Sequence, residues 1–155
     1  MKIIFEKRKS IKQVEESSSF APKFDKNGLI PVVTSDYKTG EILMHGYMNS
    51  YALKKSIEIK QAVYFSRSRK KIWHKGKTSG FIQKIKEVRI DDDQDCVLLK
   101  VKVVGGASCH VGYRSCFYRS IPLNSLGKLK LKFKDKKKVF DPKKVYINQK
   151  NPTKL

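Results

Sequence analysis

Leu29-Ile30-Pro31-Val32-Val33-Thr34 opens the stretch that decides the fold class; Asp36-Tyr37-Lys38-Thr39-Gly40 and Glu41-Ile42-Leu43-Met44-His45-Gly46-Tyr47 complete it. The two outer segments are rich in apolar and β-branched residues, which favour strands. The middle segment begins with Asp and ends with Gly, as is typical of a tight turn. The stretch therefore predicts a β-hairpin.

Around this hairpin the sequence predicts one main helix and several further strands. Asn49 or Ser50 can cap a helix over about residues 50–60, in which Leu53 and Ile57 lie four positions apart on one face. Strands are expected at 62–65, 82–90, 96–104 and, as a last core strand, 116–118. One helix among six or more strands predicts a β-rich α+β domain.

Composition allows one domain with a real core. The chain has 155 residues, of which 39% are hydrophobic, so a wholly disordered basic tail is excluded. No apolar run approaches the roughly 18 residues of a membrane span, and the first residues lack the apolar stretch of a signal peptide. Three cysteines cannot pair completely. We therefore expect free thiols, which are available to bind a metal, in a cytoplasmic protein with no membrane partner.

The charge divides the chain into three regions. The net charge is +21, from 35 Lys and Arg against 14 Asp and Glu. Residues 1–27 form a basic N-terminal arm with a serine-rich segment, which we expect to be flexible, and residues 28–123 form the domain. Residues 124–155 form an extension with 11 Lys or Arg and two Asp. This excess attracts polyanions of several kinds, including nucleic acid, without selecting one.

The C-terminal extension contains a strictly alternating segment, Lys128-Leu129-Lys130-Leu131-Lys132-Phe133-Lys134. Alternation places its apolar side chains on one face of a strand. A turn at 135–138 could lead into Val139-Phe140, so we predict a hairpin that covers a sheet edge with its lysines outward. An RNA-binding ribbon is the alternative.

Asp91-Asp92-Asp93-Gln94-Asp95 concentrates four carboxylates in five positions of a basic protein. In an extended segment, Asp91, Asp93 and Asp95 would lie on one side and repel one another unless a cation neutralised them. Carboxylate oxygens suit Mg²⁺ or Ca²⁺. A solvated acidic turn is an equally good interpretation.

Two other segments could carry chemistry. Thiols and an imidazole, the ligands that zinc prefers, lie close together in Cys109-His110-Val111-Gly112-Tyr113-Arg114-Ser115-Cys116. Buried structural cysteines are the alternative interpretation of this segment. The segment 66–78 places basic residues around Trp73 and His74, an arrangement that can bind phosphate and stack on a base. A solvated basic loop anchored by Trp73 is the alternative.

Taken in order, these segments resemble the phosphoribosyl-AMP cyclohydrolase family over about residues 27–120. The matching blocks are Gly28-Leu29-Ile30-Pro31, Gly40-Glu41-Ile42-Leu43-Met44, Tyr47-Met48-Asn49, Ser66-Arg67-Ser68-Arg69, Trp73-His74-Lys75-Gly76 with Thr78-Ser79-Gly80, Asp91-x-Asp93-Gln94-Asp95, and Cys109-His110 through Ser115-Cys116-Phe117-Tyr118-Arg119. The resemblance implies twisted antiparallel sheets in an intertwined homodimer, with active sites at the subunit interface.

The resemblance also implies an activity: hydrolysis of the N1–C6 bond of the adenine ring in 1-(5-phosphoribosyl)-AMP, the third step of histidine biosynthesis. It implies a zinc site of Cys109, Cys116 and the residue at position 92 of the other subunit. It further implies a magnesium site at Asp91, Asp93 and Asp95. Zinc lowers the pKa of bound water to about 7, which suits attack on the electrophilic C6. A nucleotide- or RNA-binding protein without this reaction is the alternative.

We assign roles to the remaining residues from their chemistry. His110 lies beside a zinc ligand and is our candidate for proton transfer. We expect the substrate to be bound by residues from the basic and hydroxyl-rich blocks: Ser66, Arg67, Arg69, Trp73, Lys75, Thr78 and Ser79.

Three positions depart from the family pattern. Asp92 stands where the family has its third zinc cysteine, Lys77 where it has Glu, and Phe81 where it has His. Aspartate can bind zinc through oxygen, so we predict that Asp92 completes the site across the dimer. Cys96 has the same strand parity but would lie about 13 Å further along an extended strand, so we predict a buried strand residue there.

Overall fold

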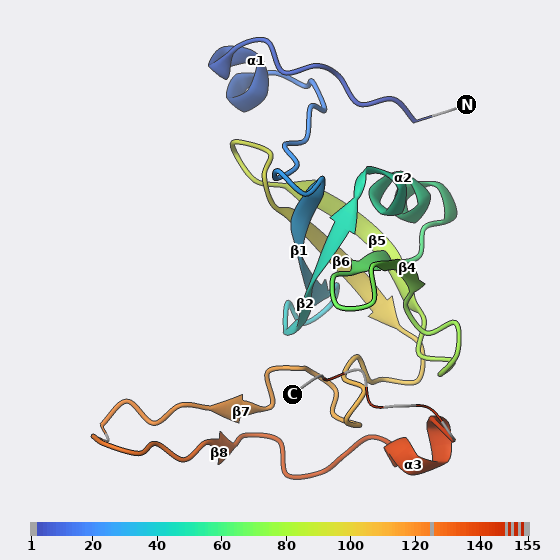
Figure 1. The fold of residues 1–155 in the computed structure, drawn as a ribbon, viewed down its shortest axis with the longest axis vertical. Coiled ribbons are helices and arrows are strands. Elements are labelled where there is room, and N and C mark those ends of the chain that lie inside the picture. The colour runs from blue at the N-terminus through green and yellow to red at the C-terminus, as the bar shows by residue number, and fades with distance from the viewer. Residues whose placement is uncertain (1–2, 125, 148, 150, 152, 154–155) are drawn as a thin grey trace.

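The computed structural model describes residues 3–124, 126–147, 149, 151 and 153 (Figure 1). Its elements follow the chain in this order: α1 (Ile11–Glu16), β1 (Leu29–Asp36), β2 (Ile42–Asn49), α2 (Ser50–Ile59), β3 (Val63–Ser66), β4 (Lys71–His74), β5 (Gln83–Ile90), β6 (Val97–Val103), β7 (Arg119–Ser120), β8 (Lys132–Phe133) and α3 (Pro142–Val145). None of the helices in the described part of the chain is long and apolar enough to cross a membrane.

The main sheet has the strand order β2-β1-β6-β5. The predicted hairpin is confirmed, because β1 and β2 pair antiparallel from Leu29 opposite Asn49 to Ser35 opposite Ile42. β1 and β6 run parallel, whereas the other strand pairs in the described ranges are antiparallel. Two smaller sheets, β3-β4 and β7-β8, complete a β-rich α+β fold, which confirms the predicted class.

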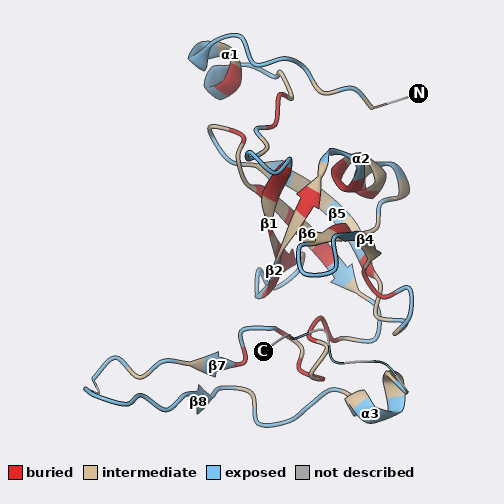
Figure 2. Cartoon of the chain, viewed as in Figure 1, coloured by how far each residue is buried: buried red, intermediate tan, exposed pale blue. Residues whose placement is uncertain are grey.

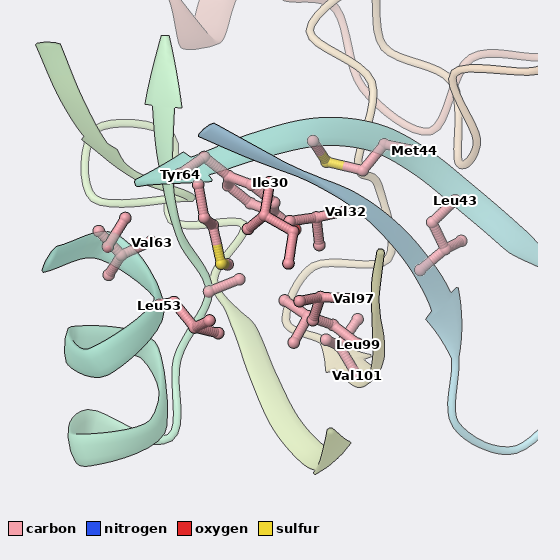
Figure 3. Close-up of a cluster of buried hydrophobic side chains, with 13 residues drawn as sticks. Ile30, Val32, Leu43, Met44, Leu53, Val63, Tyr64, Val97, Leu99 and Val101 are labelled. Carbon is pink, nitrogen blue, oxygen red and sulfur yellow. The ribbon is translucent and has the colours of Figure 1, made fainter. Parts of the chain in front are cut away.

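The core lies between the main sheet, the β3 strand and α2 (Figure 3). Ile30 and Val32 of β1 and Leu99 of β6 are fully buried. The predicted helix is confirmed: the Asn49 side chain accepts a hydrogen bond from the Ala52 amide at 2.8 Å, and Leu53 is fully buried. Each such side chain contributes roughly 1.5–3 kcal/mol on burial, so this cluster dominates the stability of the domain.

The N-terminal arm packs on the domain, although the sequence suggested a flexible segment. Phe5 contacts the core and packs edge-on to Phe20, with ring centroids 5.1 Å apart. Buried Gln94 binds the arm at three points, accepting from the Ala21 amide and donating to two backbone carbonyls of the arm, at 2.8–2.9 Å. These contacts join the arm to the aspartate-rich turn between β5 and β6.

Two strand predictions near the C-terminus are wrong. Residues 116–118 form no strand; β7 begins at Arg119. The alternating segment contributes only β8, whose partner is β7 and not Val139-Phe140. The alternation marks an apolar face, of which Phe133 packs beside the Tyr118 ring at a centroid distance of 5.9 Å and is still 57% exposed. Figure 2 shows this hairpin extending from the body as a largely exposed arm.

Candidate active site

The loop that follows β6 folds back on itself and brings its two cysteines together. The Ser108 amide donates to Arg114 O at 2.9 Å, and the Cys109 amide donates to Tyr113 O at 3.1 Å. Gly112 has φ +106°, a conformation that side chains rarely adopt, and its amide closes the turn onto Cys109 O. As a result the thiols of Cys109 and Cys116 lie within hydrogen-bonding distance.

The thiol loop (residues 108–116) is fixed to the beginning of β2. The Ser115 hydroxyl donates to Ile42 O at 2.7 Å, and the Cys116 amide donates to Leu43 O at 2.7 Å. Arg114 forms ion pairs with Asp36 at 2.9 Å and Glu41 at 2.7 Å. Burial would raise the pKa of Asp36, but backbone amides and the Arg114 guanidinium hold it below its ordinary value.

The thiol pair favours one ionised sulfur. The hydrogen bond with Cys116 lowers the pKa of Cys109 to about 6, against the effect of burial and with help from backbone amides and the Lys75 ammonium. The same hydrogen bond raises the pKa of Cys116. Cys109 is therefore the thiolate and Cys116 the donor. A thiolate beside a second thiol is a donor set that could hold zinc.

A buried polar network, which sequence reasoning missed, supports the thiol loop from the core. Tyr64 donates to Gln83 Oε1 and accepts from the Thr34 hydroxyl, both at 2.7 Å, and the Gln83 amide donates to Ser108 Oγ at 3.1 Å. All four side chains are buried. A fully satisfied buried network is rigid, so this one fixes the residue that precedes Cys109.

One cavity of about 620 Å³ brings most of the predicted site residues together. Its lining includes the candidate catalytic His110, the thiol of Cys116 and all the residues predicted to bind substrate: Ser66, Arg67, Arg69, Trp73, Lys75, Thr78 and Ser79. Its described lining residues include four Lys or Arg and no acidic side chain. The cavity therefore suits an anionic ligand.

The β3–β4 hairpin supplies the aromatic and cationic wall. The Arg67 guanidinium lies 3.9 Å from the centroid of the Tyr47 ring, and Lys75 Nζ lies 5.4 Å from that of Trp73. Trp73 is half-buried and packs against Tyr64, with ring centroids 5.6 Å apart. Burial lowers the pKa of Lys75, and the nearby thiols oppose this effect. The predicted basic segment is thus an ordered hairpin that faces the cavity.

His110 presents a ring nitrogen without a protein partner. Its Nε2 atom is buried and has no hydrogen-bond partner among the described residues. Burial, and then the charge of Lys75, lowers the pKa of His110, while a hydrogen bond with the Asn151 side chain opposes the shift. The imidazole is therefore largely neutral near pH 7, with one nitrogen available to a ligand or to water.

The aspartates lie on a tight turn, so the interpretation as an acidic turn between two strands is confirmed and the extended segment is wrong. Gln94 has φ +58°, and the Asp91 carboxylate accepts from the Asp95 and Cys96 amides at 2.9 Å. The Asp91 side chain thus caps backbone amides of the turn, and Gln94 adopts the left-handed conformation that favours glycine. The alternation of residues in the sequence cannot reveal such capping. The carboxylates of Asp91, Asp93 and Asp95 still converge, with ligand atoms within 4.8 Å of one another.

Lys23 from the N-terminal arm lies against these carboxylates, with its Nζ 3.5 Å from Asp93 and 3.3 Å from Asp95. Cys96 is half-buried and precedes β6, so it is not the buried strand residue that was predicted. The predicted distance of about 13 Å between Cys96 and position 92 assumed an extended strand. Because this segment is a turn, that distance no longer follows.

The aspartate turn and the thiol loop lie at opposite ends of β6 (Figure 1). β6 has seven residues, which span about 23 Å at about 3.3 Å per residue. Asp92 is exposed and does not line the cavity. Within one chain, then, Asp92 and the aspartate trio are far from Cys109 and Cys116.

Comparison with known proteins shows the family of the chain. A sequence model described as phosphoribosyl-AMP cyclohydrolase matches residues 44–118. A phosphoribosyl-AMP cyclohydrolase of Rhodopseudomonas palustris strain BisA53 is 52% identical over 133 residues, which cover 86% of this chain and 90% of the relative. One from Nitrobacter winogradskyi is 46% identical over 138 residues, covering 89% and 94% of the two chains. The chain belongs to the phosphoribosyl-AMP cyclohydrolase family.

The matched region of this cyclohydrolase contains the β3–β4 wall and the thiol loop, but ends before the C-terminal extension. The extension nevertheless lines the cavity with Pro142, Lys143 and Tyr146, residues that sequence reasoning did not select. Only the charge of the extension pointed to an anionic ligand. Its position against the cavity depends on long-range packing that no local pattern signals.

Proposed function

We propose that this chain hydrolyses the N1–C6 bond of the adenine ring of 1-(5-phosphoribosyl)-AMP to give the formimino-carboxamide ribotide, the third step of histidine biosynthesis. One observation carries the proposal: His110, a cationic aromatic wall and Cys116, whose thiol is hydrogen-bonded to that of Cys109, line one cavity in a cyclohydrolase-family chain. A nucleotide- or RNA-binding role without this reaction is not favoured, since the relatives are named as enzymes.

The donor groups fit two metal ions. Cys109 and Cys116 offer soft sulfur donors, with one already ionised, as zinc prefers. The converging oxygens of Asp91, Asp93 and Asp95 are hard donors that suit magnesium. Zinc, when bound, would supply Lewis-acid activation of water near neutral pH. Magnesium would neutralise the carboxylates in place of Lys23.

The side chains of the cavity have separable roles. Ribosylation at N1 makes C6 electron-poor, so the reaction needs a water that loses a proton as it attacks. His110 Nε2 is buried, unpartnered and largely neutral, so it can accept that proton and return it to N1 as the ring opens. The indole of Trp73 can stack on the base, which holds C6 in place.

The remaining lining residues bind the charged and hydroxyl groups of the substrate. Arg67, Arg69 and Lys75 provide cations for phosphate oxygens. The hydroxyls of Ser66, Thr78 and Ser79 line the same cavity and can hydrogen-bond ribose or phosphate. Because Lys75 is buried beside the thiols, it also favours the anionic form of Cys109.

We further propose that the enzyme is a homodimer and that Asp92 completes the zinc site of its partner. The separation of Asp92 from the thiol loop along β6 supports this arrangement, because one chain alone leaves the site without its third ligand. The β7–β8 arm supports it too: Ile121, Leu131 and Phe133 are 47–62% exposed, as expected of a surface that a second copy covers. The cytoplasmic location stays a prediction.

Turnover by the purified, zinc-loaded protein tests the reaction. Ring opening of phosphoribosyl-AMP changes its ultraviolet absorbance, and the proposal expects this change at a rate that falls about 10²-fold or more in His110→Asn. His74→Asn is the matched control, because His74 hydrogen-bonds Gln61 and does not line the cavity. An unmodified chain that leaves the substrate intact would refute the proposed activity.

A further inference from the structure

The segment 139–146, here the C-terminal strap, is docked on the thiol loop. The Val139 amide donates to Gly112 O at 2.7 Å. A Cβ atom on Gly112 would lie 2.4 Å from Phe140 O, so only glycine lets the strap approach this closely. The strap is thus fitted to a residue that also shapes the turn between Cys109 and Cys116.

A set of tilted and edge-on ring contacts, here called the aromatic stack, also holds the strap. The Phe140 ring packs on Phe81 with centroids 4.5 Å apart, and Tyr146 packs on Phe140 at 6.0 Å. Phe81 in turn lies over Gly105, where a Cβ atom would be 2.2 Å from its ring. Phe81 is one of the three positions that depart from the family pattern, and this stack gives its aromatic ring a partner within the chain.

The docked strap places Lys143 in the cavity wall. Asp141 caps the short helix α3 by accepting from the Lys143 amide at 3.0 Å, and Pro142, Lys143 and Tyr146 line the cavity. Lys144, the next residue, is also exposed but does not line it. The strap therefore presents one lysine of a neighbouring pair to the ligand.

We propose that Lys143 binds a phosphate of the substrate and that the Phe81–Phe140 stack positions it there. The inference rests on the proposed function, whose substrate carries two phosphate groups at opposite ends. Arg67, Arg69 and Lys75 come from the β3–β4 side, whereas Lys143 comes from a segment far along the chain. Basic side chains on two separate segments can each contact one of the two phosphates, which a single cluster of basic side chains would do less well.

Steady-state kinetics of Lys143→Gln and Lys144→Gln test the contact. Loss of one charge-assisted contact should raise KM for phosphoribosyl-AMP about tenfold in Lys143→Gln and change kcat little. Lys144→Gln should keep the KM of the unmodified chain. Equal KM values in the two variants would overturn the inference while the activity itself stands. An unmodified chain without turnover would refute the proposed function and this contact with it.

Hydrogen exchange tests the docking independently of turnover. Phe140→Ala should speed exchange at the Val139 amide and raise KM as Lys143→Gln does, because the strap then loses its stack. Ile147→Ala is the control, since Ile147 is 69% exposed and outside the stack. Unchanged exchange and KM in Phe140→Ala would show that the stack does not position the strap.

Discussion

The two ends of β6 carry candidate metal ligands of opposite character. The thiol loop is held by the core, because the Gln83 side chain donates a hydrogen bond to the Ser108 hydroxyl and the Cys116 amide donates one to Leu43 O of β2. The aspartate turn is held by the N-terminal arm through Gln94 and is neutralised by Lys23. One end lines a cavity that can enclose a ligand, whereas at the other end Asp91 is exposed and Asp93 and Asp95 are half-buried.

Neither end alone has every ligand that the proposed function requires. The thiol loop has soft donors, a cavity and a proton acceptor, but its third expected ligand lies at the far end of the strand. The aspartate turn has hard donors in the right cluster but no cavity of its own. Both ends become functional together if the aspartate turn of one copy meets the thiol loop of another.

The largest expected effect follows from removing the thiols. Cys109→Ser with Cys116→Ser should lose the zinc, expected at about one ion per chain, and lower turnover by about 10³-fold or more, since water is then not activated. Zinc content by elemental mass spectrometry and turnover measure this. Cys96→Ser should keep both, because Cys96 lies at the other end of β6. Full zinc occupancy in the double variant would show that the site is elsewhere.

The next effect tests the aspartate end. Asp92→Ala should weaken zinc binding by at least about tenfold, because the site loses an oxygen ligand. Asp92→Cys should retain or tighten binding, since a thiolate is a better donor. Competition with a zinc chelator measures the affinity. If Asp92→Ala and the unmodified chain bind zinc equally, Asp92 is not a ligand.

A moderate effect tests how the arm supports the aspartate turn. Gln94→Leu removes three hydrogen bonds to the arm and leaves their backbone partners unpaired, so the free energy of unfolding should fall by about 2 kcal/mol. Urea unfolding measures the loss. Lys12→Leu is the control, because Lys12 lies exposed on the same arm. Equal losses in the two variants would mean that Gln94 does not anchor the arm.

The smallest effect concerns Lys77, one of the departures from the family. Burial lowers the pKa of His74, and the charge of Lys77 lowers it further. Lys77→Glu replaces repulsion of the imidazolium with attraction, so the pKa of His74 should rise toward or above its ordinary value. NMR titration of the ring protons measures it. A fall in the pKa of His74, or no change in it, would show that the charge of Lys77 does not act on His74.

Local patterns were enough for much of the fold and for the lining of the cavity on the β3–β4 side. The β1–β2 hairpin and the Asn49 cap depend on neighbouring residues, and the residues of the basic block were selected by their chemistry. The strap and the β7–β8 pairing could not be predicted, because Phe140 meets Phe81 and Arg119 meets Phe133 only through distant packing. The acidic turn at Gln94 was one of two interpretations, because alternation does not show that Asp91 caps the backbone amides that form it.

Mixing two inactive variants tests the shared site most directly. The first variant carries Cys109→Ser and Cys116→Ser, and the second carries Asp92→Ala and Asp93→Ala. After the chains are reassorted, a heterodimer would have one site with intact thiols and intact aspartates. A shared site predicts recovery of up to about one quarter of the unmodified turnover, because about half of the dimers are mixed and each has one working site. No recovery, with heterodimers seen by native mass spectrometry, would contradict it.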